Sequence, residues 1–426
     1  MTGTKTTVEH SGPERPSRAR RQAALIAAFP RCHAMPLPAL DRPVGRAWLA
    51  DADLADAKVS GQHVRFSRIG SKLHVEDVGS RNGSWLDGER LGPEGLDGPQ
   101  PLNEGAVLRL GGTLLVYRQA FDGDFKPASP IGELIGPYGL RNVAQAVAAF
   151  ERNPPGNVLI EGETGTGKEL AARAVAVALG RAEPYVAVNV AGVPTGVFES
   201  QLFGHTAGAF SDARSAAPGT IAAHDKGAVF LDELSELPLE LQPKLLRLLE
   251  NHEVQTVGAE RPTAVDVLLI AATNRDLQSF ANDGHFRLDL YARLALARMT
   301  LPPLRDRPED VFAIARHLAD GLEPAACEVE AIERMMLDPW PSNVRGVQAM
   351  FGELASIDPA PGLRTWSVEQ VLGSHDKPRA SAPARAVTLT AEAIQAAIDG
   401  CGGNETQAAR RLGVSRGKLR RFLKKS

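Results

Sequence analysis

Residues 158–169 carry a glycine-rich pattern that constrains the central part of the chain more than any other feature. An apolar run at 158–160 leads into a loop with glycine at 162, 165 and 167, and Lys168 opens an alanine-rich stretch. Glycines let backbone N–H groups turn towards a phosphate, and the lysine neutralises the β- and γ-phosphate charge. The pattern therefore predicts a strand, a phosphate-binding loop and a helix. The residues expected to contact the nucleotide are Gly162, Glu163, Thr164, Gly165, Thr166, Gly167, Lys168 and Glu169.

A second motif supplies acidic groups downstream. The short apolar run 227–231 reads as a buried strand, and Asp232 and Glu233 follow it. An aspartate at a strand end can hold Mg²⁺ through water, and the adjacent glutamate can polarise the attacking water. Glu169 stands where a metal-binding Ser or Thr usually follows the lysine, so the metal is expected to rest mainly on Asp232. Together the two motifs predict an ATPase that uses ATP and Mg²⁺.

Composition bounds the remaining possibilities. A chain of 426 residues with 43% apolar residues is long enough for two to four domains with real cores, and a net charge of −3 argues against a generally basic, nucleic-acid-coating protein. The three cysteines, Cys32, Cys327 and Cys401, have no paired spacing, so neither a disulfide framework nor a zinc site is indicated. No apolar run approaches about 18 residues, and residues 1–24 lack the apolar core of a signal peptide. A soluble, cytoplasmic protein without a membrane partner is expected.

The pattern of apolar residues and turns divides the chain into a multidomain protein. Short alternating runs separated by glycine and Asp/Asn turns predict an all-β sandwich, alternating helices and apolar strands predict an α/β domain, and a proline-punctuated helical stretch follows it. The expected parts are a disordered tail at 1–24, the β-sandwich at 25–121, a linker at 122–133, the α/β domain at 134–301, a helical lid at 302–375, a linker at 376–387 and a small all-α unit at 388–426.

Further motifs follow the phosphate loop in a fixed order. They lie at residues 202–205, 208–213, 270–275, 286–294, 301–307 and 340–345. In this order they resemble the AAA+ ATPase domain of bacterial enhancer-binding proteins, the activators of sigma-54 RNA polymerase. The resemblance implies that the domain hydrolyses ATP and remodels the sigma-54 holoenzyme.

The same resemblance assigns catalytic roles. Asn189 would pair with the catalytic Glu233, and Asn274 would orient water or report the γ-phosphate. Arg345 would approach the nucleotide of its own subunit. Arginines supplied in trans stabilise the charge that spreads over a transferring γ-phosphate, so the finger arginines imply a hexameric ring. The expected catalytic residues are Lys168, Asp232, Glu233, Asn189, Asn274, Arg287, Arg293 and Arg345.

The contact loop at 208–213 is the part of this family that touches sigma-54. Phe210 is retained, and Ser211 keeps the hydroxyl of the family's threonine. Asp212 replaces a glycine, which adds a carboxylate and restricts the backbone. The loop expected to contact sigma consists of Gly208, Ala209, Phe210, Ser211, Asp212 and Ala213.

Residues 25–121 resemble a forkhead-associated (FHA) domain, a β-sandwich that binds phosphothreonine peptides at its loop tips. The likeness lies in Gly45-Arg46, in Ser60 with His63, and in the run 77–84. Arg46 would pair with phosphate, Ser60 would donate its hydroxyl, and His63 would brace the loop. Gly61 departs from the family, which usually has Arg or Lys there. The residues expected to bind a phosphothreonine-containing protein or a kinase are Arg46, Ser60, Arg81 and Asn82.

Residues 388–426 read as three short helices and resemble a Fis-type helix-turn-helix. Eight Lys or Arg occur between Asn404 and Ser426, against Glu405 alone. Such a concentration of charge suits contacts to the phosphates of double-stranded DNA. Arg416 and Lys418 begin the last helix and are expected to reach base edges, as a dimer on the duplex. The residues expected to contact DNA are Arg416, Lys418, Arg420, Arg421, Lys424 and Lys425.

Together these features predict a phosphopeptide-controlled, DNA-anchored ring ATPase that acts on sigma-54 RNA polymerase. One alternative is a DNA-bound, phosphopeptide-responsive regulator in which ATP is only a structural switch and sigma-54 is not the target. Another, suggested by Asp212, is an ATPase that remodels a different protein.

Overall fold

The computed structural model describes residues 21–92, 95–122, 124–192, 194–210, 213–358 and 362–373. They lie within one compact unit. The expected helix-turn-helix at 388–426 and the linker at 376–387 lie outside the described residues. None of the described helices is long and apolar enough to cross a membrane.

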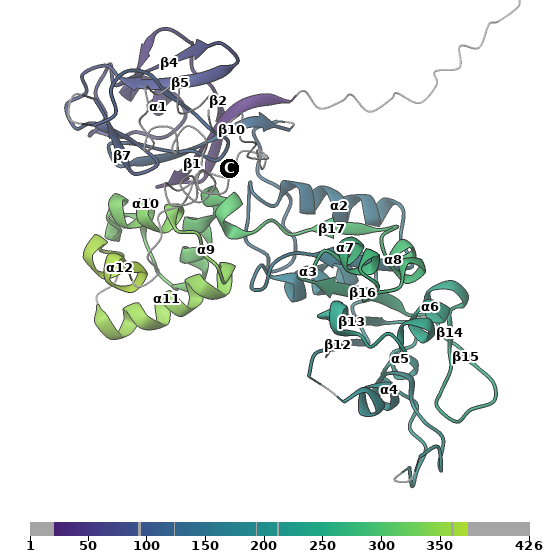
Figure 1. The fold of residues 1–426 in the computed structure, drawn as a ribbon. Coiled ribbons are helices and arrows are strands. Elements are labelled where there is room, and N and C mark those ends of the chain that lie inside the picture. The colour runs from purple at the N-terminus through teal and green to yellow at the C-terminus, as the bar shows by residue number, and fades with distance from the viewer. Residues whose placement is uncertain are drawn as a thin grey trace, which may run out of the picture. The chain divides into compact units, whose positions relative to one another are not determined.

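The amino-terminal domain is a sandwich of two antiparallel sheets (Figure 1). One sheet has the order β2-β1-β10-β9-β6-β7 and the other the order β3-β4-β5-β8. Strand β1 already begins at Gln22, within the range expected to be a tail. The elements are β1 (Gln22–Phe29), β2 (His33–Pro36), β3 (Pro43–Val44), α1 (Arg46–Asp51), β4 (Val64–Ile69), β5 (Lys72–Asp77), β6 (Ser84–Leu86), β7 (Glu89–Leu91), β8 (Gln100–Pro101), β9 (Val107–Leu110) and β10 (Thr113–Phe121).

Strands β1 and β10 are apolar on both faces, which is unusual for a sheet with one face in water. Leu115 and Tyr117 point into the core between the two sheets, whereas Leu114 and Val116 enter a different core that contains the lid helices. Successive side chains of a strand point to opposite faces, so β10 contributes to both cores. The larger sheet is therefore covered by its partner sheet on one face and by the lid on the other.

The central domain is a five-stranded parallel sheet of order β12-β13-β16-β11-β17 with helices on both faces. Alternate residues of β13 point to opposite faces of the sheet. Ala228 and Phe230 belong to the core that includes α3, whereas Val229 and Leu231 belong to the core that includes α4 and α6. Its elements are α2 (Arg141–Arg152), β11 (Asn157–Glu161), α3 (Lys168–Ala178), β12 (Tyr185–Asn189), α4 (Thr195–Phe203), α5 (Thr220–Ala223), β13 (Ala228–Asp232), η1 (Leu234–Glu236), α6 (Gln242–Asn251), β14 (Glu253–Val254), β15 (Thr263–Ala264), β16 (Leu268–Thr273), α7 (Leu277–Asn282), α8 (Leu288–Leu294) and β17 (Arg298–Thr300).

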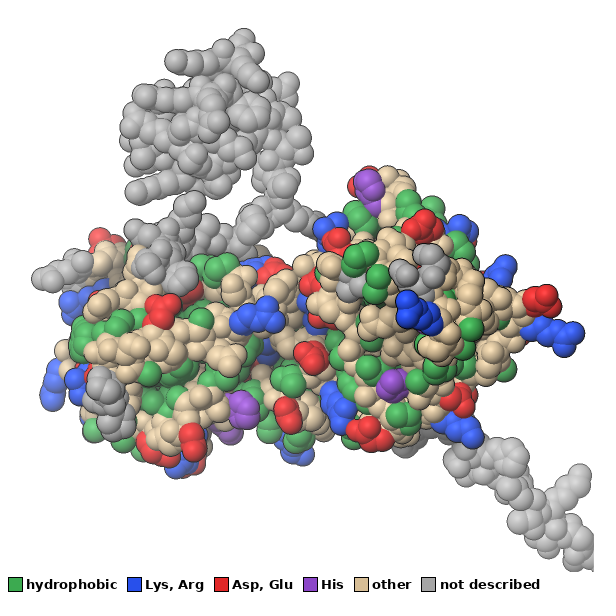
Figure 2. Space-filling view, turned by 90° about the horizontal axis from the view of Figure 1, so that it is seen from below, with side chains coloured by type: hydrophobic (Ala, Val, Ile, Leu, Met, Phe, Trp, Pro, Cys, Tyr) green, Lys and Arg blue, Asp and Glu red, His purple; other side chains and the backbone are tan. Residues whose placement is uncertain are grey.

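A helical lid follows β17. It consists of η2 (Leu304–Asp306), η3 (Pro308–Asp310), α9 (Val311–Leu318), η4 (Pro324–Ala326), α10 (Val329–Leu337), α11 (Asn343–Ile357) and α12 (Thr365–Leu372). Phe29 of β1 meets Phe312 of α9 edge to face, with ring centroids 4.9 Å apart, so the lid core continues into the amino-terminal sheet. On the face shown in Figure 2, basic and acidic side chains of the described residues are interspersed, in keeping with the near-neutral net charge.

Candidate nucleotide site and peptide-binding loops

The phosphate loop, residues 162–167, joins β11 to α3. Gly165 and Gly167 have φ angles of 80° and 100°, a region that side chains disfavour. A Cβ at Gly165 would lie 2.1 Å from the carbonyl oxygen of Ser342, so only glycine permits this approach of loop and lid. The buried Lys168 ammonium donates hydrogen bonds to the carbonyl oxygens of Gly162 (3.0 Å) and Glu163 (3.3 Å). The loop thus holds a cation where a triphosphate would enter, and these residues suit ATP.

The acidic edge lies beside this loop because three parallel strands end together. Asp232 ends β13, Asn274 follows β16, and β16 pairs with both β13 and β11. Asn274 Nδ2 donates to Thr164 Oγ1 at 3.3 Å. Glu233 adopts a φ of 55°, and its amide donates to Asp232 Oδ1 at 2.9 Å. The sheet therefore brings Lys168, Asp232, Glu233 and Asn274 to one edge.

Asn189 ends the neighbouring strand β12 and lies opposite Asp232 in register. Its Oδ1 accepts a hydrogen bond from the amide of Ala191 at 2.8 Å. The expected partner, Glu233, lies directly after Asp232, so the two side chains start from adjacent strand ends.

Mg²⁺ would rest on few protein ligands here. Among the described residues, no group of three His, Cys, Asp or Glu side chains forms a metal-binding cluster. Magnesium in nucleotide sites is commonly held by one or two carboxylates, with phosphate oxygens and waters completing its shell. A single carboxylate from Asp232 beside the phosphate loop fits that requirement.

The three expected arginines occupy two different places. Arg345 lies in the first turn of α11, which touches the phosphate loop through a hydrogen bond from the Val344 amide to Gly165 O at 3.0 Å. Arg287 directly precedes α8 and forms an ion pair with Asp289 at 2.7 Å. Arg293, in the last turn of α8, donates to Leu249 O at 3.1 and 3.2 Å.

Arg293 lines a cavity of about 590 Å³ together with Gly156 and Asn157. Asn157 begins β11, and the phosphate loop follows its other end. Five residues of strand span about 16 Å. Arg293 is therefore placed far from the phosphate loop of its own chain.

Two polar residues of the lid hold the phosphate loop and had no assigned role in the sequence. Arg305 of η2 donates to Glu163 Oε2 at 2.7 Å and also to Glu163 Oε1. Asn343, fully buried, donates to Glu163 Oε2 (3.2 Å) and Thr164 O (3.0 Å) and accepts from the Leu304 amide (2.7 Å). The hydrogen bond from Arg305, then that from Asn343, lowers the pKa of Glu163. Asn343 holds these contacts with a positive φ of 53°. No periodicity in the sequence indicates them.

The contact loop lies between α4 and α5. The amide of Gly208 donates to Ala213 O at 2.8 Å, and the Ala213 amide donates to Phe210 O at 3.0 Å. Phe210 is 44% exposed, and its ring centroid lies 5.0 Å from that of His205. An exposed phenylalanine in a glycine–alanine setting is available for contact with a partner. Ser211 and Asp212 lie outside the described residues.

The amino-terminal loops bring the four expected peptide-binding residues around residues 57–60. The Arg46 guanidinium donates to Val59 O at 3.0 Å, and the Arg81 amide donates to Ser60 Oγ at 3.1 Å. Asn82 Nδ2 donates to Lys58 O at 2.6 Å. The side chains of Arg46, Arg81 and Asn82 are exposed at this surface.

Two residues hold these loops in place. His63 is fully buried, accepts from the Ser60 amide at 2.9 Å and bonds Gly83 O at 3.1 Å, so its expected bracing role is confirmed. Asp77 accepts from the hydroxyls of Ser80 and Ser84, each at 2.6 Å. Burial raises the pKa of Asp77, but the hydrogen bonds from these serines outweigh it and leave that pKa below its usual value. The 77–84 run thus owes its shape to the half-buried carboxylate of Asp77, which accepts these hydrogen bonds.

Comparison with known proteins agrees with this architecture. Three family models match the chain: the Sigma-54 interaction domain over residues 138–300, the FHA domain over 43–111 and the Fis family of bacterial regulatory proteins over 390–425. The transcriptional regulatory protein FlbD of Caulobacter vibrioides is 34% identical over 344 residues, which cover 71% of this chain and 75% of that protein. The chain belongs to the sigma-54-dependent transcriptional activators.

Other members of the family extend the comparison. The DNA-binding transcriptional regulator NtrC of Rhizobium meliloti is 35% identical over 309 residues, covering 63% of this chain and 64% of NtrC, so the chain spans just under two thirds of that relative. The crystal structure of NtrX from Brucella abortus in complex with ADP aligns with a TM-score of 0.50 and 27% identity over 69% of each chain. The predicted fold class is confirmed: this activator has an FHA domain, an AAA+ ATPase domain and a Fis-type helix-turn-helix in that order.

Proposed function

We propose that this activator hydrolyses ATP in a ring of subunits and uses the cycle to remodel sigma-54 RNA polymerase at promoters to which its helix-turn-helix anchors it. The observation that carries the proposal is the carboxyl edge of the parallel sheet. Lys168 follows the phosphate loop, Asn274 contacts it, and Asp232 and Glu233 lie at the end of a neighbouring strand, which supports this proposal. Phosphoryl transfer requires little more than positioning and charge stabilisation, and these groups supply both.

Each residue has a distinct task in this mechanism. When nucleotide binds, the Lys168 ammonium would exchange its hydrogen bonds to the Gly162 and Glu163 carbonyl oxygens for contacts with the β- and γ-phosphates. Asp232 would hold Mg²⁺ through water. Bound magnesium would neutralise charge on the phosphates. Glu233 would take the proton of the attacking water, and Asn274 would fix that water against the γ-phosphate.

The finger arginine supports a ring. Arg293 lies near the amino end of β11, about a strand length from its own phosphate loop, so any nucleotide it serves belongs to a neighbouring subunit. Arg287 directly precedes the same helix, and its ion pair with Asp289 would open when a phosphate competes for it.

The two signalling surfaces complete the proposal. Phe210 is exposed on the contact loop and would meet sigma-54, together with Ser211 and Asp212, which follow it in the sequence. Arg46, Ser60, Arg81 and Asn82 would receive a phosphothreonine peptide, because exposed cations and a hydroxyl converge on one loop. Binding of that peptide would report a kinase signal to the ATPase.

Substitution of the proposed general base tests this mechanism. Glu233→Gln is expected to bind ATP as the native chain does and to hydrolyse it roughly 10²–10⁴-fold more slowly. Turnover and sigma-54-dependent open-complex formation are measured on the full chain with promoter DNA. Native turnover in Glu233→Gln excludes that residue from catalysis. Open-complex formation that persists without turnover would instead favour ATP as a structural switch.

A further inference from the structure

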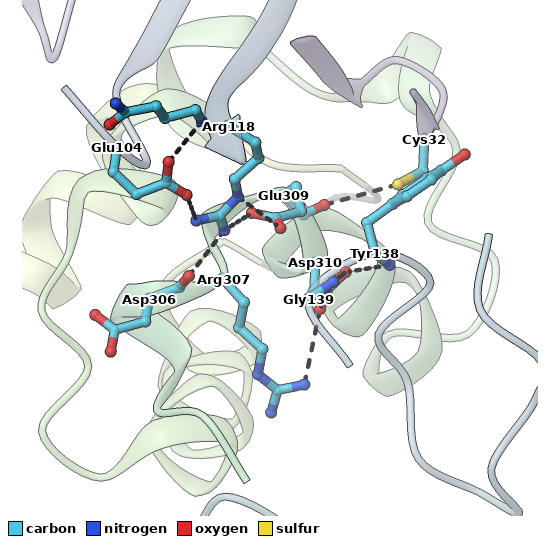
Figure 3. A network of polar contacts seen from close by, with 10 residues as sticks. Cys32, Glu104, Arg118, Tyr138, Gly139, Asp306, Arg307, Glu309 and Asp310 are labelled. Carbon is cyan, nitrogen blue, oxygen red and sulfur yellow. Dashed lines mark hydrogen bonds and ion pairs between the residues drawn. The ribbon is translucent and has the colours of Figure 1, made fainter. Parts of the chain in front are cut away.

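One short segment of the lid, residues 304–310, lies between the amino-terminal sheet and the phosphate loop. It comprises η2 and η3, and both sides of it carry charged contacts. Figure 3 shows Arg118 of β10 reaching this segment from the amino-terminal domain.

On its first side the segment is held by Arg118. The guanidinium donates to Glu309 Oε1 at 3.1 Å and to the backbone oxygen of Asp306 at 2.8 Å, while Nη1 binds Glu104 at 3.0 Å. The Arg118 and Glu309 side chains are only 15% and 1% exposed. Charge pairs that are this deeply buried have strict geometry, because a displaced partner leaves an uncompensated charge.

On its other side the segment holds the phosphate loop. Arg305 pairs with both carboxylate oxygens of Glu163, and the Leu304 amide donates to Asn343 Oδ1, whose Nδ2 in turn donates to Glu163 and to Thr164 O. Arg118 donates a hydrogen bond to the carbonyl oxygen of Asp306, which directly follows Arg305 in the chain. Movement of the backbone at 305–306 therefore changes both contacts at once.

We propose that Arg118 is a positioning residue for the nucleotide loop. By fixing residues 304–310 it sets Arg305 against Glu163, and so the FHA domain determines how well the phosphate loop is formed for ATP. This deepens the proposed function and rests on it, since it assigns to the FHA domain a route to the nucleotide site of the same chain.

The second ion pair of the interface provides a matched control. Arg109 of β9 lies 2.8 Å from Glu333 of α10, with both side chains 8% exposed. Arg109 also binds Glu330, again on α10. This pair joins the same two domains at similar burial but does not touch residues 304–310.

The test compares two double variants of the full chain, in which both partners are replaced so that no buried charge is orphaned. Arg118→Met with Glu309→Gln is expected to weaken ADP binding and raise the KM for ATP about 3- to 10-fold, with kcat within about twofold. Arg109→Met with Glu333→Gln is expected to leave both constants within about twofold. Arg118→Lys keeps the charge but cannot make two parallel hydrogen bonds to the carboxylate. Its ADP affinity and its KM for ATP are expected to fall between those of the native chain and the first double variant.

A further set of variants tests whether Arg118 acts through the contact between Arg305 and Glu163. In a chain carrying Arg305→Met with Glu163→Gln, adding Arg118→Met with Glu309→Gln is expected to change ADP affinity no further, because the contact through which Arg118 acts is already absent. Calorimetry with ADP measures each affinity, and thermal unfolding confirms that every variant is folded.

The outcomes separate the two proposals. If the native chain binds no nucleotide, the proposed function fails and this inference with it. If the native chain binds ADP but the two double variants weaken binding equally, or neither does, only the positioning role of Arg118 is overturned. Additive losses in the Arg305→Met background also overturn it.

Discussion

At the scale of single residues, the loops proposed to bind the phosphopeptide include one close backbone contact that requires glycine and one glycine position with free space around it. A Cβ at Gly45 would lie 2.1 Å from Ser60 O, so that glycine is required for the loop. A Cβ at Gly61 would meet nothing within 4 Å, and the residue is exposed. The position therefore has room for the Arg or Lys that the family usually has there, and only the cationic side chain is absent.

Gly61→Lys is accordingly expected to bind phosphothreonine peptides more tightly than the native chain. An added ammonium beside Ser60 and Arg46 can make a charge-assisted hydrogen bond, worth about 1 kcal/mol at an exposed site, or roughly fivefold in affinity. Calorimetry with phosphorylated and unphosphorylated peptides measures the change, and Gly61→Gln controls for chain length. Equal affinities for the lysine and glutamine variants would show that position 61 does not face the phosphate.

At the scale of elements, helix α10 contacts the amino-terminal sheet through the buried carboxyl group of Glu333, which lies beside Arg109. Burial raises the pKa of Glu333 to about 7, Arg109 of β9 partly opposes this, and Glu330 and Asp87 add to it. A carboxyl whose folded pKa is raised stabilises the fold fully below its unfolded pKa, and this stabilisation is lost as pH rises through the folded value.

The native chain is therefore expected to lose about 1 kcal/mol of unfolding free energy between pH 6 and pH 8 relative to Glu333→Gln. The difference between the two chains cancels the contribution of groups they share, such as Asp310, whose pKa burial also raises to about 7. Denaturant unfolding at several pH values provides the measurement. Parallel pH profiles for the two chains would show that Glu333 does not titrate in this range.

The elements that sequence reasoning predicts well are those with local signals. Glycine at fixed offsets before Lys168 and an apolar run before Asp232 define the strands and loops on their own, and parallel strands then bring their carboxyl ends together. The lid contacts have no such signal. Arg305 and Glu163 are 142 residues apart, and Arg118 and Glu309 are 191 apart. An arginine on a strand ordinarily indicates a solvent-facing position, and only the apolar residues on both faces of β10 show that this sheet is covered.

At the scale of the whole molecule, the position of Arg293 predicts that catalysis is shared between subunits. Rings mixed from Arg293→Ala and Glu233→Gln subunits are expected to regain part of the native turnover, because some interfaces then combine an intact base with an intact arginine. Turnover is measured across mixing ratios, with each variant alone as the control. Mixed rings that form, as shown by a tagged subunit, yet remain inactive would give Arg293 a structural role instead.

Docking of the two domains also predicts the behaviour of a thiol. Cys32 follows β1, and its Sγ lies 3.9 Å from Glu309 O; burial, then the carboxylates of Asp310 and Glu309, raises its pKa far above the ordinary value. In a chain with Cys327→Ser and Cys401→Ser, alkylation of Cys32 at pH 8 is expected to be roughly tenfold or more slower than in the denatured chain, because the thiolate is the reacting species. Arg118→Met with Glu309→Gln is expected to accelerate it, since loosening the interface admits water to the sulfur, whereas urea-unfolded samples of both chains should react alike. Alkylation of the native chain at the denatured rate would mean that the amino-terminal sheet does not remain on the lid in solution.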